Sequence, residues 1–169
     1  MERDRVVKRL LLLRHAKAVP HGTVNDFDRT LAERGREDMA LLAAHLGELD
    51  PAPDLALVSP AARTLETWDL CGLPGVPVRH EEAIYEASLP TLQRVVLALP
   101  DTARLAILVG HNPAFEDFAA SLKGARDFRG LPTAGLILAE WEVEQWREAS
   151  LGLGRLVEIV TPASLGRAG

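Results

Sequence analysis

The sequence predicts an α/β protein, a three-layer α/β/α sandwich with a mainly parallel central sheet. Short, wholly apolar runs alternate along the chain with longer stretches in which apolar residues recur every three or four positions. The runs at 10–13 and 105–109 are typical of strands buried on both faces, as in a parallel sheet. Strands that alternate with helices form such sheets, and the helices then cover both faces.

The first strand is predicted at Leu10–Leu13, and Arg14 and His15 follow where it ends. Residues 15–28 are polar and rich in turn-forming residues, so we expect a loop over the strand ends. Ligands bind beyond the carboxyl ends of strands in open α/β sheets, which makes Arg14 and His15 candidates for a site. A strand end with a surface arginine and a hydrogen-bonded histidine is the alternative.

A helix is predicted over residues 31–49, where apolar side chains keep a 3.6-residue period. Thr30 precedes Glu33 by three positions, which is the spacing of a capping box. The proline-rich stretch at 50–53 ends this helix.

A second strand is predicted at Asp54–Val58, and a second helix from Ser59 to about Leu70. Serine is a preferred N-cap, and proline, here Pro60, is favoured at the first helical position. Arg63 then lies in the first turn, where a helix N-terminus favours anions.

The same patterns predict the remaining elements: a short strand within 74–79, a helix over 88–99, a strand at 105–109, a helix to about Leu122, and closing strands within 133–143 and 155–161. Asn112 is the expected N-cap of the helix that ends near Leu122, with Pro113 as its first residue. His111 is therefore expected at a strand-to-helix turn, as is His15.

The chain of residues 1–169 is expected to form a single domain, because it shows no repeat and no linker. Residues 164–169 are expected to be a frayed tail. Composition is globular, with 47% hydrophobic and 25% charged residues. Cys71 is the only cysteine, which excludes an intrachain disulfide.

The formal net charge of −5 argues against nucleic-acid and membrane partners, because such surfaces need clustered positive charge. The charged start and the short apolar run after it resemble neither a signal peptide nor a membrane span. We therefore expect a cytoplasmic enzyme or binding domain.

Three strand ends supply Arg14 with His15, then Arg63, then His111. Carboxyl ends of parallel strands face one side, so these residues can converge. Two arginines and two histidines suit a compact anion such as a phosphoryl group. No spacing suggests a metal site and no glycine-rich phosphate loop is present, so we expect no metal and no cofactor.

Three motifs occur in the order typical of the histidine phosphatase superfamily: LRHAKA at 13–18, VSPAART at 58–64 and VGHNP at 109–113. The chain resembles the compact branch of SixA-type phosphohistidine phosphatases, and with YEAS and LPTAG the resemblance spans residues 10–138. It implies the phosphoglycerate mutase-like fold and a phosphatase.

The resemblance also implies a role for each residue of the pocket. His15 matches the nucleophilic histidine, which attacks phosphorus and is transiently phosphorylated. Arg14 and Arg63 match the arginines that hold the phosphoryl oxygens, and His111 matches the second histidine of the phosphate pocket. These roles agree with the chemistry, since covalent catalysis divides a hard transfer into two easier steps and fixed cations stabilise phosphoryl charge.

Glu81, Glu82 and Glu86 lie in the region where larger members of the superfamily place a general acid, and Glu82 is our preferred candidate. Three solvated surface carboxylates are the alternative. Asn25, in the loop after the nucleophile, is a candidate phosphate ligand, with a plain solvated loop as its alternative.

We therefore expect a metal-independent phosphatase that acts through a phosphohistidine enzyme intermediate on protein phosphohistidine. Imidazole is a better leaving group than an alkoxide, so such a substrate has less need of an acid. The expected partner is a phosphorylated protein or a small phosphorylated metabolite. The alternatives are a small-molecule phosphomonoesterase, a phosphoglycerate-mutase-like transferase and a non-catalytic phosphate-binding domain.

Overall fold

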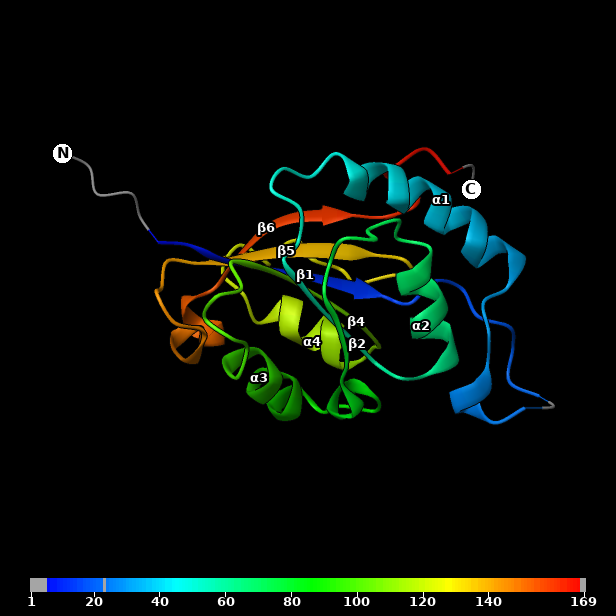
Figure 1. Cartoon of the computed structure of the whole chain (residues 1–169), viewed down its shortest axis with the longest axis horizontal. Helices are drawn as coiled ribbons and strands as arrows, with labels where there is room; N and C mark the ends of the chain where they lie inside the picture. Colours follow the sequence, from blue (N-terminus) through cyan, green and yellow to red (C-terminus); the bar gives the residue numbers. More distant parts are fainter. Residues whose placement is uncertain (1–5, 23, 168–169) are drawn as a thin grey trace.

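The computed structural model describes residues 6–22 and 24–167, in which one six-stranded sheet lies between two layers of helices (Figure 1). The strand order is β3-β2-β4-β1-β5-β6. The pairs β1–β4, β4–β2 and β2–β3 are parallel, whereas β1–β5 and β5–β6 are antiparallel. The strands are β1 (Lys8–Arg14), β2 (Leu55–Val58), β3 (Val78–His80), β4 (Leu105–Gly110), β5 (Leu136–Trp141) and β6 (Arg155–Val160). The predicted mainly parallel sheet is confirmed.

Helices α1 (Glu33–Gly47) and α2 (Ala62–Asp69) cover one face of the sheet, and α3 (Leu89–Leu97) and α4 (Ala114–Ala120) cover the other (Figure 1). Alternate residues of β1 serve the two cores. Leu11 and Leu13 pack in the core on the α1 side, which contains Met39, Leu42 and Leu46 of that helix. These three side chains of α1 belong to the 3.6-residue apolar pattern from which the helix was predicted.

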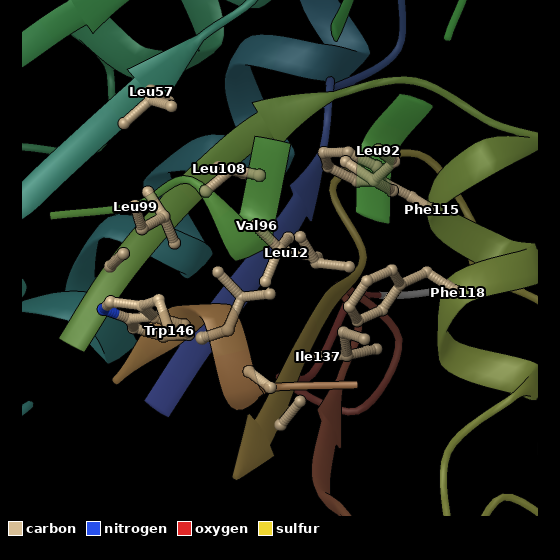
Figure 2. Close-up of a cluster of buried hydrophobic side chains, with 14 of the residues drawn as sticks. Leu12, Leu57, Leu92, Val96, Leu99, Leu108, Phe115, Phe118, Ile137 and Trp146 are labelled. Carbon is tan, nitrogen blue, oxygen red and sulfur yellow. The ribbon is translucent and has the colours of Figure 1, made fainter. Parts of the chain in front are cut away.

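The second core lies between the sheet and helices α3 and α4 (Figure 2). Leu12 of β1 and Phe118 of α4 belong to it and are almost fully buried. Trp146, in a short 3-10 helix (Trp146–Glu148), closes this core and donates from Nε1 to the carbonyl of Ala103 at 2.8 Å. Polar edges of buried aromatic rings need such partners. Within the described residues, no helix is long and apolar enough to cross a membrane.

Helix α1 begins at Glu33, and the predicted capping box is wrong. Leu31 pairs with Ala18 in an isolated antiparallel bridge, and the carbonyl of Thr30 accepts from the amide of Val19 at 2.9 Å. The backbone before α1 is therefore extended and paired with the segment after β1. This pairing overrides the local preference of a Thr-x-x-Glu sequence.

The C-terminal segment contacts α1 through Arg167, residues 168–169 lie outside the described residues, and the expected fraying of 164–169 stays a prediction. Arg167 donates from Nη1 to Oδ2 of Asp38 at 2.8 Å. Asp38 is 1% exposed. A buried carboxylate needs a charged or hydrogen-bonding partner, and Arg167 supplies one from the far end of the chain.

Substituting Arg167→Ala is expected to lower the free energy of unfolding by about 2 kcal/mol, because it leaves the Asp38 carboxylate buried without this partner. Urea denaturation at pH 7 measures the effect. Arg147→Ala is the matched control, since Arg147 is exposed in a 3-10 turn. Equal midpoints for the two variants would contradict the prediction.

Candidate active site

The register of three parallel strands aligns the strand ends after which the predicted site residues follow. Leu13 pairs with Val109 between β1 and β4, and Val109 pairs with Val58 between β4 and β2. The residues that follow these three therefore lie side by side at the carboxyl edge. The amide of His15 donates to the carbonyl of Gly110 at 3.0 Å, which ties the end of β1 to the turn that carries the second histidine.

His15 is held in one tautomer by its neighbouring backbone. Its Nδ1 lies 2.7 Å from the carbonyl oxygen of Ala16, so Nδ1 carries the proton and donates. Its Nε2 has no hydrogen-bond partner in the described part of the chain and keeps its lone pair. The amide of Ala16 donates to Oγ1 of Thr67 on α2 at 3.0 Å, which fixes the backbone beside the ring.

Arg63 and His111 lie together beside His15. Arg63 is in the first turn of α2, as predicted, and its Nη2 lies 3.3 Å from Nδ1 of His111. A guanidinium can only donate, so Nδ1 accepts, and Nε2 of His111 carries the proton that it shares with Oγ of Ser59 at 2.8 Å. The rings of His15 and His111 have centroids 5.4 Å apart.

Ser59 therefore orients His111, and its predicted role as N-cap is wrong. Helix α2 begins at Ala62, three residues later, and the residue before it, Ala61, makes no side-chain cap. Oγ1 of Thr64 donates to the carbonyls of Ser59 and Ala61 and holds the turn instead.

Asn112 is likewise not the predicted N-cap, because its side chain bonds to residues on the Arg14 side of the site instead. Its Nδ2 donates to Oε2 of Glu116 and to the carbonyl of Leu131, both at 2.9 Å, and α4 begins at Ala114. Arg14 donates from Nη1 to the same carbonyl of Leu131 at 2.9 Å. The Leu131 carbonyl thus fixes the guanidinium of Arg14.

The pocket combines neutral histidines with charged arginines. Burial, together with the charges of Arg63 and Arg14, lowers the pKa of His15 to about 4. Burial and the charge of Arg63 lower the pKa of His111 to about 3. Both rings are therefore neutral at pH 7, so His15 can act as a nucleophile while the arginines supply the positive charge.

Two guanidinium N–H groups in this pocket have no partner. The Nε atoms of Arg14 and Arg63 are buried, yet neither makes a hydrogen bond in residues 6–22 and 24–167. Buried charged donors are costly when left unpaired, so each of these Nε–H groups is a candidate donor to an anion. Among these described residues no group of three or more histidine, cysteine or acidic side chains is placed to hold a metal ion.

The histidine titrations can be measured directly. We expect the ring NMR signals of His15 to titrate with a midpoint near pH 4 in the ligand-free protein, well below the usual value of about 6.5, because burial and two guanidinium charges oppose protonation. The His15→Asn variant assigns the signal. A midpoint at the ordinary value would contradict the neutral, buried ring.

Sequence reasoning missed two residues of the site, Asp26 and Tyr85. Oδ2 of Asp26 accepts from Nη2 of Arg63 at 3.1 Å and from the hydroxyl of Tyr85 at 2.8 Å. The ring of Tyr85 meets that of His111 edge-on, with centroids 5.5 Å apart. Tyr85 lies in the YEAS phrase that marked the resemblance, whereas Asp26 lies in a polar loop whose pattern gives no such signal.

The candidate acids and Asn25 remain predictions. Glu82 is exposed in a 3-10 turn (Glu82–Ile84), and its carboxylate makes no hydrogen bond or ion pair with the described residues. Glu81 caps that turn by accepting from the amide of Ala83 at 3.1 Å. Glu86 is exposed with a φ of 54°, and Asn25 is exposed before the 3-10 turn Asp26–Asp28 without capping it.

Residues 10–98 match the model of the histidine phosphatase superfamily, branch 1. An uncharacterised protein of Mycobacterium leprae is 30% identical over 162 residues, covering 89% of this chain and 99% of its own. A solved structure assigned as the phosphohistidine phosphatase SixA of Agrobacterium tumefaciens is 29% identical, with a TM-score of 0.78 over 92% of this chain and 98% of that one. Its counterpart from Nakamurella multipartitia is 25% identical, with a TM-score of 0.76 over 92% and 96%.

Proposed function

Because this chain belongs to the histidine phosphatase superfamily and is a phosphatase of the SixA type, we propose that it removes the phosphoryl group from phosphohistidine in proteins. His15 is the nucleophile, Arg14 and Arg63 hold the phosphoryl oxygens, and His111 completes the phosphate pocket. One observation carries the proposal. The same site contains a His15 whose Nε2 has no partner and two arginines whose buried Nε atoms have none.

The reaction follows from these positions in two steps. Nε2 of His15 attacks phosphorus, the P–N bond to the substrate imidazole breaks, and the leaving imidazole takes a proton from solvent. Water then attacks the phosphoryl group on His15, releasing inorganic phosphate and restoring the neutral ring. The guanidinium groups stabilise the charge on the phosphoryl oxygens during both steps.

The surroundings of the pocket support a phosphoramidate substrate. None of the candidate acids Glu81, Glu82 and Glu86 hydrogen-bonds to His15 or His111 in the described residues. An alkoxide leaving group needs a proton from such an acid, whereas the leaving imidazole can take its proton from solvent. The structural likeness to proteins assigned as phosphohistidine phosphatases supports the same substrate class.

The test compares three substrates in EDTA: a phosphorelay domain carrying phosphohistidine, phosphoimidazole, and an aryl phosphate. We expect the phosphorylated domain to be dephosphorylated with a kcat/KM about tenfold or more above phosphoimidazole, and the aryl phosphate to be the poorest substrate. Phosphoimidazole shares the leaving group without the protein, so it isolates the contribution of the protein surface.

Equal or greater efficiency on the aryl phosphate would overturn the proposal in favour of a small-molecule phosphomonoesterase. Binding of the phosphorylated domain without loss of phosphate would indicate a phosphate-binding domain. Loss of activity in EDTA that returns with a divalent cation would contradict metal independence.

A further inference from the structure

The carboxylate of Asp26 is the meeting point of three elements around the pocket. Asp26 opens the 3-10 turn Asp26–Asp28 in the loop between β1 and α1. Arg63 reaches it from the first turn of α2, and Tyr85 reaches it from the segment after β3. Arg29, from the same loop, donates from Nε to Oδ1 at 3.1 Å and from Nη1 to the carbonyl of Val19 at 2.8 Å.

Asp26 accepts hydrogen bonds from both terminal nitrogens of Arg63. Nη1 of Arg63 donates to the backbone carbonyl of Asp26 at 2.7 Å, and Nη2 donates to Oδ2 at 3.1 Å. Nη2 also lies 3.3 Å from Nδ1 of His111. A guanidinium is planar, so these contacts fix its orientation as well as its position.

The contacts with Asp26 leave the Nε–H of Arg63 for a ligand. Of the five N–H groups of the guanidinium, those that contact Asp26 and His111 are engaged, while the buried Nε–H has no partner in the described part of the chain. The Nε–H is therefore the group that Arg63 keeps for the phosphoryl group, because Asp26 binds Nη1 and Nη2 and His111 takes the second proton of Nη2.

Tyr85 fixes the carboxylate and the ring beside it. Its hydroxyl donates to Oδ2 of Asp26 at 2.8 Å, and its ring lies 6.0 Å from the guanidinium carbon of Arg63. The same ring meets His111 edge-on. One side chain thus contacts the carboxylate, the arginine and the second histidine of the pocket.

Asp26 is a charged group at neutral pH and not a proton donor. Burial acts to raise its pKa, but the hydrogen bond from Tyr85 and the charges of Arg63 and Arg29 outweigh burial and lower the pKa to about 2. A general acid must carry a proton near the working pH, so the chemistry of Asp26 is that of a fixed counter-charge.

We propose that Asp26 is the positioning residue of this phosphatase: it holds Arg63 by its terminal nitrogens so that Nε faces the bound phosphoryl group, with Tyr85 locking the carboxylate in place. The inference rests on the assignment of Arg63 to phosphoryl binding under the proposed function. It adds a residue that acts through Arg63 and touches no reacting atom.

The test substitutes Asp26→Asn, which keeps the shape and removes the charge. We expect kcat/KM for an aryl phosphate to fall about 10- to 100-fold, and inhibition by inorganic phosphate to weaken in step, because Arg63 is no longer held in one orientation. Tyr85→Phe should give a smaller loss of about 3- to 10-fold. Asp28→Asn is the matched control, since Asp28 is an exposed carboxylate in the same turn.

A double-mutant cycle separates positioning from general damage. In an Arg63→Ala background, Asp26→Asn should change kcat/KM by less than about twofold, because the residue through which it acts is gone. Additive losses would overturn the inference, as would an Asp26→Asn variant equal to Asp28→Asn. If Arg63→Ala itself leaves activity and phosphate inhibition unchanged, the assignment of Arg63 fails, which is a different result.

Discussion

Replacing His15 by alanine is expected to lower turnover by about 10⁴-fold or more and to abolish the phosphoenzyme. In the proposed mechanism the ring supplies the attacking Nε2, and the described residues place no second nucleophile with a free imidazole nitrogen beside the two arginines. Trapping with a radiolabelled phosphohistidine protein should give an acid-labile, alkali-stable label on the wild type and none on His15→Ala.

The variant should still bind inorganic phosphate, because Arg14, Arg63 and His111 remain. Phosphate binding therefore shows that the pocket is folded. His80→Ala is the control, since His80 is exposed at the end of β3. Retention of more than about a hundredth of wild-type turnover by His15→Ala would be inconsistent with a covalent intermediate on this residue.

The second large effect is expected at Arg63. Arg63→Ala should lower kcat by about 10²–10³-fold, because it removes a preorganised cation from the charge that develops on the phosphoryl oxygens. Arg63→Lys should recover little of this loss. Lysine is a point charge without the planar fork that contacts Asp26 and His111 at once.

Steady-state kinetics with the aryl phosphate, and inhibition by inorganic phosphate, measure both Arg63 variants. Arg79→Ala serves as the reference for losing an exposed arginine, since Arg79 lies on the edge strand β3. A lysine variant with wild-type kcat would show that charge alone suffices at this position. In that case the bidentate geometry would have no role.

The strands and the positions of Arg14, His15, Arg63 and His111 were predictable from the sequence because they depend on local patterns. A central parallel strand must be apolar on both faces, so runs such as Leu10–Leu13 identify it, and the residue after it lies at the sheet edge by topology alone. The first-turn position of Arg63 was predicted from a helix start at Ser59, and it holds although α2 begins at Ala62.

The caps and the Asp26 contacts were not predictable, because they depend on residues far apart in the chain. Ser59 bonds to His111, which is 52 positions away, and Asp26 accepts from Tyr85, which is 59 positions away. A cap prediction weighs only the nearest few residues, so it assigns Ser59 to the helix that follows it. Ser59 and Asn112 make hydrogen bonds within the site, and helices α2 and α4 begin after them, at Ala62 and Ala114.

The short bridge between Ala18 and Leu31 has a consequence for changes of length in the loop between β1 and α1. Its hydrogen bonds close the loop at its base, so changes of length nearer the tip do not reach β1 or α1. Extra residues at the exposed stretch Pro20–Gly22, ahead of the turn that contains Asp26, add only a slowly growing closure entropy. The same loop also carries Asp26, which holds Arg63, so a change of length that leaves β1 and α1 in place must also keep the turn Asp26–Asp28 where it is.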